Sequence, residues 1–186
     1  MKIDLPFYDY KEEFTPIGVL ERLMDHPEPS GVCLTTIGGC AVPISGDRLV
    51  CNKAINIMVI IPHTTHREFV GFVGFFMTML ASVLRTHTNV ATITSNGVSI
   101  MYEGKTIGLS SSAVYSDIGV LYVTLFVEQP SVKNDPNYKD KIGVLPTDGV
   151  DLSEIDGNLD TMFHNLQREL FQQELAMRVS GMSEGK

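Results

Sequence analysis

The chain has 186 residues, of which 44% are hydrophobic and 19% are charged, and this composition excludes an intrinsically disordered protein. The length predicts a single domain over residues 1–186, with a frayed tail at 181–186. The net charge is -8 and the 14 basic residues are scattered, which excludes a broad basic surface for nucleic acid. We therefore expect no nucleic-acid partner.

The N-terminus and the cysteines indicate the compartment. No basic stretch followed by an apolar run opens the chain, so we expect no secretory signal. Cys33, Cys40 and Cys51 are an odd number in a chain too long to need disulfides, and no C-x-x-C pair occurs. We expect a cytoplasmic protein with small buried cysteines.

The first third of the chain predicts a short helix followed by strands. Residues 15–24 favour a helix capped by Thr15. Residues 31–61 are rich in β-branched residues, with breaks at Gly38, Gly39 and Pro43 and a turn signal at 45–47. The nearly continuous apolar run 55–62 (INIMVIIP) is typical of a strand covered on both faces.

A long apolar helix is predicted from 65 to 86. Thr64 or Thr65 can cap it, and Glu68 completes a capping box with Thr65. Residues 69–84 carry no charge but are shorter than the roughly 20 residues that span a bilayer. We expect a central helix buried on nearly all sides, no membrane partner, and close packing at Gly71 and Gly74.

Strands dominate the second half of the chain. We predict strands at 90–96 and 120–127, and between them a hairpin over 98–110 with Glu103 and Gly104 at its tip. Residues 130–150 favour a long loop, and a closing helix runs from Ser153 or Leu159 to Val179. The pattern predicts an α+β fold, with a mixed, largely antiparallel sheet packed against the central and C-terminal helices.

Lys105, just past the hairpin tip, is the first candidate for chemistry. A lysine held there by a sheet can present a compact cation to a carboxylate or phosphate, although a solvated surface lysine has the same spacing. Ser110 and Ser112 share one side of the following strand while Ser111 faces the other, so either side can line a pocket. A polar strand edge explains these serines equally well.

Two segments resemble a known family. The stretch SNGVSIMYEGKTIGLSSS, residues 95–112, is similar to the Asn-Asp…Gly-x-Lys-x-x-Gly hairpin of the biotin and lipoate protein ligase superfamily. Upstream, IGGCAVPISGDRL resembles that superfamily's Gly-rich segment, and the two segments occur in the same order. Residues 95–127 look closer still to a small set of uncharacterised microbial proteins of the superfamily.

The resemblance implies a ligase-like fold and a ligase or acyltransferase activity. It implies that Lys105 contacts the acyl group and phosphate of an acyl-adenylate, with ATP and Mg²⁺ as cofactors and a carboxylated small molecule as partner. Together with the two serines, the candidate ligand-binding residues are Gly38, Gly39, Asn96, Gly108, Ser110 and Ser112.

Departures from the family pattern leave other functions open. Thr35 and Thr36 stand where lipoate ligases carry paired arginines, Gly97 replaces an acid, and Cys40 replaces a third glycine. Either Arg48 or Lys53 substitutes for the arginines, or the fold serves another ligand. A non-catalytic binding module and an oligomeric structural protein therefore remain alternatives, the latter because the apolar strands and helix can overfill one core.

His63 and His66 form an H-x-x-H pair at the strand-to-helix junction. Two such histidines can share a metal, but His63 precedes the helix and no further ligands are evident. A capping or pocket-lining pair is the alternative, and we expect no metal site.

Overall fold

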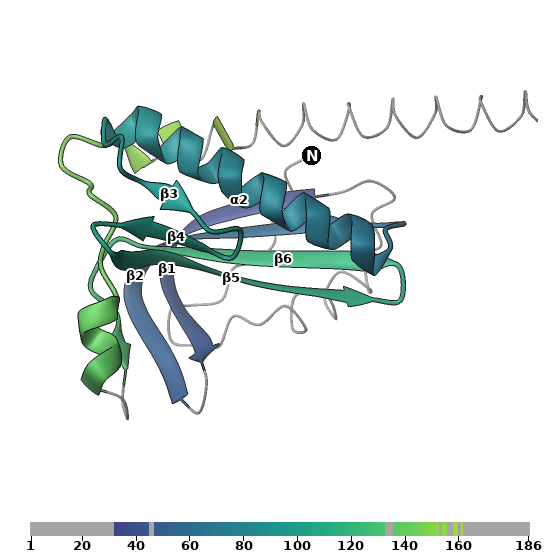
Figure 1. The fold of residues 1–186 in the computed structure, drawn as a ribbon, viewed down its shortest axis with the longest axis horizontal. Helices are drawn as coiled ribbons and strands as arrows, with labels where there is room; N and C mark the ends of the chain where they lie inside the picture. The colour runs from purple at the N-terminus through teal and green to yellow at the C-terminus, as the bar shows by residue number, and fades with distance from the viewer. Residues whose placement is uncertain are drawn as a thin grey trace, which may run out of the picture.

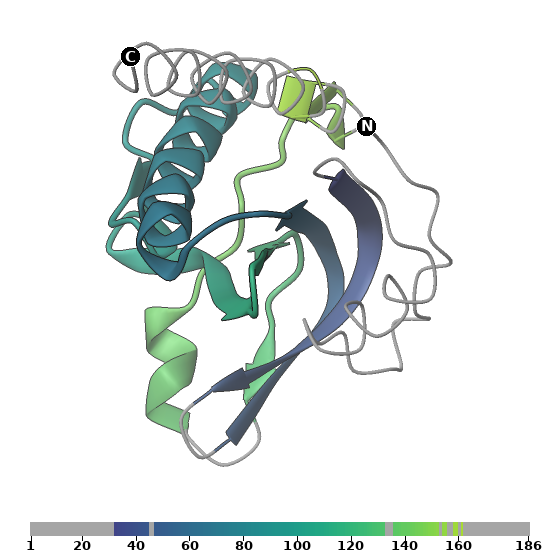
Figure 2. The ribbon, with the colours of Figure 1, turned by 90° about the vertical axis from the view of Figure 1, so that its right-hand side faces the viewer.

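The computed structural model describes residues 32–44, 47–132 and 136–152, with 154, 155, 158, 159 and 161. Within these residues, seven strands form one curved sheet and one long helix packs along one of its faces (Figures 1 and 2). The predicted helix at 15–24 and most of the predicted C-terminal helix lie outside the described residues. The α+β prediction is confirmed.

The sheet has the order β1-β2-β6-β5-β4-β3, and every pairing between named strands is antiparallel. The long strands are β1 (Val32–Ile44), β2 (Asp47–Ile61), β5 (Lys105–Tyr115) and β6 (Ile118–Phe126). The short strands are β3 (Thr94–Ser95), β4 (Ser99–Tyr102) and β7 (Ser131–Val132), which pairs with β2. The predicted strand 90–96 is therefore wrong in extent, because only two of its residues pair with β4.

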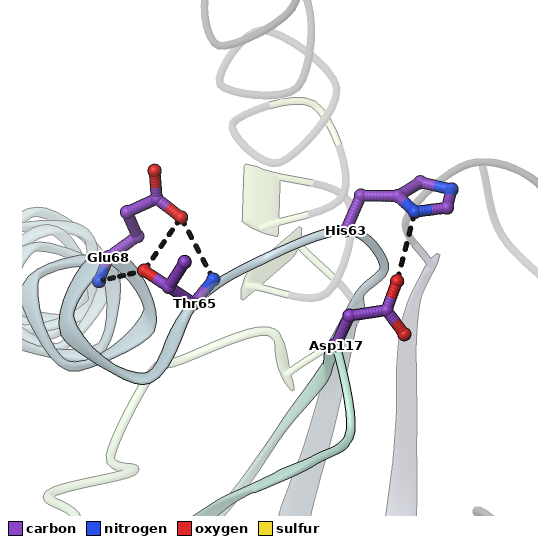
Figure 3. Close-up of polar contacts among 4 residues, drawn as sticks. All are labelled: His63, Thr65, Glu68 and Asp117. Atoms are coloured by element: carbon purple, nitrogen blue, oxygen red, sulfur yellow. Dashed lines mark hydrogen bonds and ion pairs between the residues drawn. The ribbon is translucent and has the colours of Figure 1, made fainter.

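Helix α2 (His66–Thr88) begins as the sequence predicts. Thr65 is the N-cap, its hydroxyl accepts from the Glu68 amide at 3.3 Å, and the Glu68 carboxylate accepts from the Thr65 amide at 2.9 Å (Figure 3). This reciprocal capping box lowers the pKa of the exposed Glu68 carboxyl, chiefly through the backbone hydrogen bond from Thr65. The cap fixes where the helix leaves the loop after β2.

The expectation that α2 is buried on nearly all sides is wrong. Its inner face, including Phe69, Phe76 and Leu80, is fully buried against the sheet, whereas Val70 is 56% exposed and Phe75 is 51% exposed. By length and composition alone α2 could cross a membrane, but that inner face is part of the core. The helix is amphipathic because only one sheet face meets it.

Gly71 and Gly74 lie on the outer face of α2. A Cβ built on either residue meets no heavy atom within 4 Å, so the close packing expected at these glycines is not found. Glycine in a helix interior costs about 1 kcal/mol relative to alanine. We expect Gly71→Ala and Gly74→Ala each to raise the free energy of unfolding by about 0.5–1 kcal/mol, measured by urea denaturation. A loss of stability in either variant would show that another element covers this face.

Two apolar clusters cover the two faces of the sheet. The α2-side cluster joins the inner face of α2 to alternate residues of β2 and β6, such as Ile57 and Val123. The opposite cluster contains the intervening residues, such as Met58 and Tyr122, together with Cys40, Cys51 and Ile142. The predicted burial of 55–62 and 120–127 on both faces is thus confirmed, except that Ile61 is half-buried and Pro62 and Val127 lie beyond the strands.

The segment predicted as a long loop, 130–150, has structure of its own. It contains β7, the 3₁₀ helix η1 (Pro136–Lys141), and a parallel bridge between Ile142 and Thr106 of β5. The Leu145 amide then donates to the Phe126 carbonyl at 2.7 Å. The pairing of β5 with β6 begins at Gly108, and before that point Ile142 takes the place of β6 beside Thr106. The segment therefore lies next to Lys105.

Candidate functional site

Lys105 is the first residue after a two-residue hairpin turn. Glu103 has φ 49° and Gly104 has φ 74°, so both central residues occupy the left-handed region. That combination defines a type I′ turn, which matches the twist of the flanking strands, and Tyr102 pairs directly with Lys105. The turn predicted from Glu103 and Gly104 is confirmed, and it fixes the position of the Lys105 backbone.

The stem of Lys105 packs against Gly143. A Cβ on Gly143 would lie 3.1 Å from the Lys105 Cβ and 3.4 Å from its Cδ, and the Gly143 amide donates to the Thr106 carbonyl at 3.0 Å. Lys105 is nevertheless exposed, and it makes no ion pair with any residue that the structure describes. The lysine therefore has a supported stem and a solvated ammonium, as an anion-binding group requires.

Gly38 and Gly39 lie at the same end of the sheet as Lys105 but are not in contact with it. Gly38 pairs with Ala54, which pairs with Phe126, so β2 and β6 separate β1 from β5. Three strand spacings amount to about 14 Å. Because paired residues share a face, Gly38 belongs to the face opposite α2, whereas Lys105 belongs to the α2 face with Tyr102.

Asn96 and Ser110 both bind the backbone of the turn before β4. The Asn96 Oδ1 accepts from the amides of Val98 at 3.0 Å and Ser99 at 2.7 Å, and the Ser110 hydroxyl donates to the Val98 carbonyl at 2.5 Å. Their polar groups thus stabilise the β3–β4 connection and the adjoining strand β5. Asn96 is exposed, so its amide nitrogen can still reach a ligand.

Gly108 and Ser112 have different surroundings. Gly108 is buried at a bulge between β4 and β5, and a Cβ there would lie 2.6 Å from the Leu125 Cδ2. A side chain at this position would therefore displace the buried Leu125 side chain. Ser112 is exposed and shares the α2 face with Ser110, while Ser111 pairs with Tyr122 on the other face.

The sequence prediction missed a buried polar cluster on the face opposite α2. The Asn56 Oδ1 accepts from the hydroxyls of Tyr122 at 3.0 Å and Thr124 at 3.2 Å, and its Nδ2 lies 3.5 Å from the Gly39 carbonyl oxygen. Asn56, Tyr122 and Thr124 are at most 3% exposed, and burial raises the pKa of Tyr122. The sequence held a sign of this cluster: Asn56 is the one polar residue in the apolar run 55–62, and Tyr122 and Thr124 stand at alternate positions in the run 120–127.

His63 and His66 do not form a metal site with other described residues. The His63 Nδ1 lies 3.1 Å from the Asp117 Oδ2 (Figure 3). The Thr64 amide donates to the Asp117 carbonyl at 2.9 Å. Within the described residues, no group of three or more potential ligands gathers. The His63–Asp117 pair ties the loop before α2 to the β5–β6 turn, at the far end of β5 from Lys105.

Comparison with known proteins identifies the fold. No protein-family model and no curated protein matches the chain. A protein of unknown function from Pyrococcus horikoshi has a TM-score of 0.57 at 12% identity, covering 91% of this chain and 94% of its own. Biotin protein ligase from Leishmania major in complex with biotinyl-5-AMP has a TM-score of 0.54 at 14% identity, covering 86% and 75%.

Two further structures extend this similarity. Biotin protein ligase from Aquifex aeolicus in complex with biotin and ATP has a TM-score of 0.51 at 11% identity, and the match covers 75% of this chain and 61% of the ligase. A T. acidophilum protein with bound lipoic acid has a TM-score of 0.53 at 12% identity, covering 87% and 91%. The chain therefore has the fold of the biotin and lipoate protein ligases.

Proposed function

We propose that this protein binds a carboxylated small molecule, or its adenylate, with Lys105 contacting the acidic group. The observation that carries the proposal is the exposed Lys105 ammonium on a stem packed against Gly143. The fold supports it, since proteins of the same fold hold biotin, biotinyl-5-AMP or lipoic acid. Biotin and lipoic acid are both carboxylic acids.

In the catalytic form of the proposal, ATP with Mg²⁺ activates the carboxylate and the acyl group then passes to an amine or thiol. Lys105 contributes by stabilising the negative charge of the carboxylate and the phosphate. The A. aeolicus ligase with biotin and ATP supports a nucleotide as second ligand on this fold. Gly38 and Gly39 stay proposed ligand contacts, but Gly38 lies about 14 Å from Lys105 and on the opposite face of the sheet. One ligand contacts both only if it passes over the end of the sheet where both lie.

Lys53 is our proposed replacement for the family's paired arginines. Ala54 of β2 pairs with Gly38 of β1, and Cys51 of β2 pairs with Cys40 of β1. Lys53 lies between these two pairs and is therefore opposite Gly39, where the register of β1 and β2 shifts. Lys53 is exposed. A thermal-shift titration with ATP and Mg²⁺ tests this role, because Lys53→Met should remove a shift that the wild-type protein shows.

A non-catalytic binding module is the second candidate. The presence of Thr35 and Thr36 in place of the arginines favours it, because neither threonine carries a guanidinium that could hold a phosphate. A wild-type shift with biotin, lipoate or another organic acid but none with ATP and Mg²⁺ would establish the module. A shift with ATP and Mg²⁺ would establish the ligase-like form.

An oligomeric structural role is the third candidate, favoured by the exposed Val70 and Phe75 on α2. Light scattering coupled to size-exclusion chromatography distinguishes it, since a monomer at high concentration excludes it.

Lys105→Met is the direct test of the ligand contact. Methionine keeps an apolar stem against Gly143 and removes only the charge, so we expect the affinity for the carboxylate to fall roughly 30-fold. The thermal midpoint should stay within a few degrees. Lys139→Met, which changes an exposed lysine in η1, is the matched control and should bind like the wild type. Equal affinities in the two variants, measured by calorimetry, would remove Lys105 from the site.

A further inference from the structure

The further inference concerns two cysteines that the proposed ligand site does not use. Cys40 of β1 and Cys51 of β2 are direct cross-strand partners, both belong to the cluster opposite α2, and both are free thiols. Cys40 is 0% exposed and Cys51 is 1% exposed. Directly opposed residues in an antiparallel pair have Cα atoms roughly 4.5–5.5 Å apart, which lies within the range that a disulfide spans.

We propose that Cys40 and Cys51 form a reversible disulfide that closes the β1–β2 hairpin when the protein meets a small peroxide. This reaction is independent of the proposed carboxylate ligand. It needs no movement of the strands, because the two side chains already share one face.

The contact with Cys40 favours Cys51 as the attacking sulfur, whereas two carbonyl oxygens hold its proton. The Cys51 thiol donates to the Lys53 carbonyl oxygen at 3.0 Å and to the Glu128 carbonyl oxygen at 3.2 Å, so its thiolate forms only when that proton leaves. The hydrogen bond with Cys40 lowers the pKa of Cys51 to about 7, although burial acts in the opposite direction, and the same contact raises the pKa of Cys40. Because the pKa is lowered at Cys51 and raised at Cys40, we assign the first attack to the Cys51 sulfur and the second to the Cys40 sulfur.

The proposal needs a route for a water-sized oxidant, and the described residues leave space near the pair. Strand β1 ends the order of the sheet, and a Cβ built on Gly38 meets no heavy atom within 4 Å, which indicates open space two residues from Cys40. Forming the disulfide removes the hydrogen bond from the Cys51 thiol to the Lys53 carbonyl oxygen. That oxygen keeps two hydrogen bonds, because it also accepts from the amides of Val127 and Glu128.

The chemistry balances with hydrogen peroxide as the oxidant. The Cys51 thiolate attacks one peroxide oxygen, the O–O bond breaks, and hydroxide leaves to take up a proton, so that Cys51 becomes a sulfenic acid. The Cys40 sulfur then attacks the Cys51 sulfur, and the S–S bond forms as the sulfenic oxygen leaves as water. The two sulfurs lose two electrons, and one peroxide becomes two waters.

The test uses the full chain carrying Cys33→Ser, so that Cys40 and Cys51 are the only cysteines. After treatment of the folded protein with hydrogen peroxide, denaturation and iodoacetamide, we expect no alkylated cysteine, a mass lower by two hydrogens, and a peptide that links Cys40 to Cys51. Dithiothreitol should restore two alkylatable thiols. Adding Cys40→Ser should abolish the link and leave a sulfenic acid at Cys51 that dimedone traps.

Three results would overturn the proposal. The first is that both thiols of the folded protein stay alkylatable after a peroxide treatment that oxidises them when the protein is unfolded in urea. The second is that the linked peptide joins two separate chains, which a non-reducing gel would reveal as a dimer. Oxygen addition to either sulfur without a Cys40–Cys51 link would also contradict it.

Discussion

Replacing Gly119 with alanine should destabilise the protein by about 3 kcal/mol, because the new methyl group enters the core where α2 crosses β6. A Cβ on Gly119 would lie 2.3 Å from the Cδ2 and 2.5 Å from the Cε2 of Phe69, well inside van der Waals contact. The ring cannot withdraw freely, since Phe69 is 1% exposed and stacks on Phe72 with centroids 5.9 Å apart. Urea denaturation measures the loss.

A second-site change identifies the cause of that destabilisation. Phe69→Ala removes every ring atom that the methyl group meets, so the double variant Gly119→Ala/Phe69→Ala should be more stable than the two separate losses predict. Gly71→Ala is the control, because its methyl group points into open space. Additive losses in the double variant would rule out the steric account.

Replacing Asn56 with alanine should cost about 3 kcal/mol. The substitution removes the Oδ1 acceptor that the buried hydroxyls of Tyr122 and Thr124 share, and it leaves a cavity between β2 and β6. Thermal and urea unfolding measure the effect. Asn52→Ala, on an exposed residue of the same strand, is the matched control and should change stability by less than about 0.5 kcal/mol.

The origin of the Asn56 effect can be isolated by removing the whole polar cluster. In Asn56→Leu/Tyr122→Phe/Thr124→Val no side-chain hydroxyl of the cluster remains, so much of the loss should be recovered. A triple variant as unstable as Asn56→Ala would show that volume, rather than the lost acceptor, dominates.

The local elements of this fold were predictable, because the residues that specify them are neighbours in the sequence. The Glu103-Gly104 turn and the Thr65–Glu68 capping box each depend on residues at most three apart. The extent to which α2 is buried was not predictable, since an apolar helix has the same sequence pattern whether one face or its whole surface is covered. Only the packing shows that Phe75 faces outward.

The candidate site was predictable in part for the same reason. The sequence indicated Lys105 and its hairpin, but the distance between Gly38 and Lys105 depends on the strand order, in which β6 lies between β2 and β5. That order is a tertiary property. The Asn56 cluster was missed because one polar residue in an apolar run carries weight only when Tyr122 and Thr124 lie beside it.

The most direct test of the proposed function is a crystal structure of the full chain with the carboxylic acid that gives the largest thermal shift. Our account predicts an acidic oxygen of the ligand within about 3 Å of the Lys105 Nζ, with the lysine stem still packed against Gly143. A ligand bound elsewhere, with the Lys105 ammonium still in solvent, would contradict it.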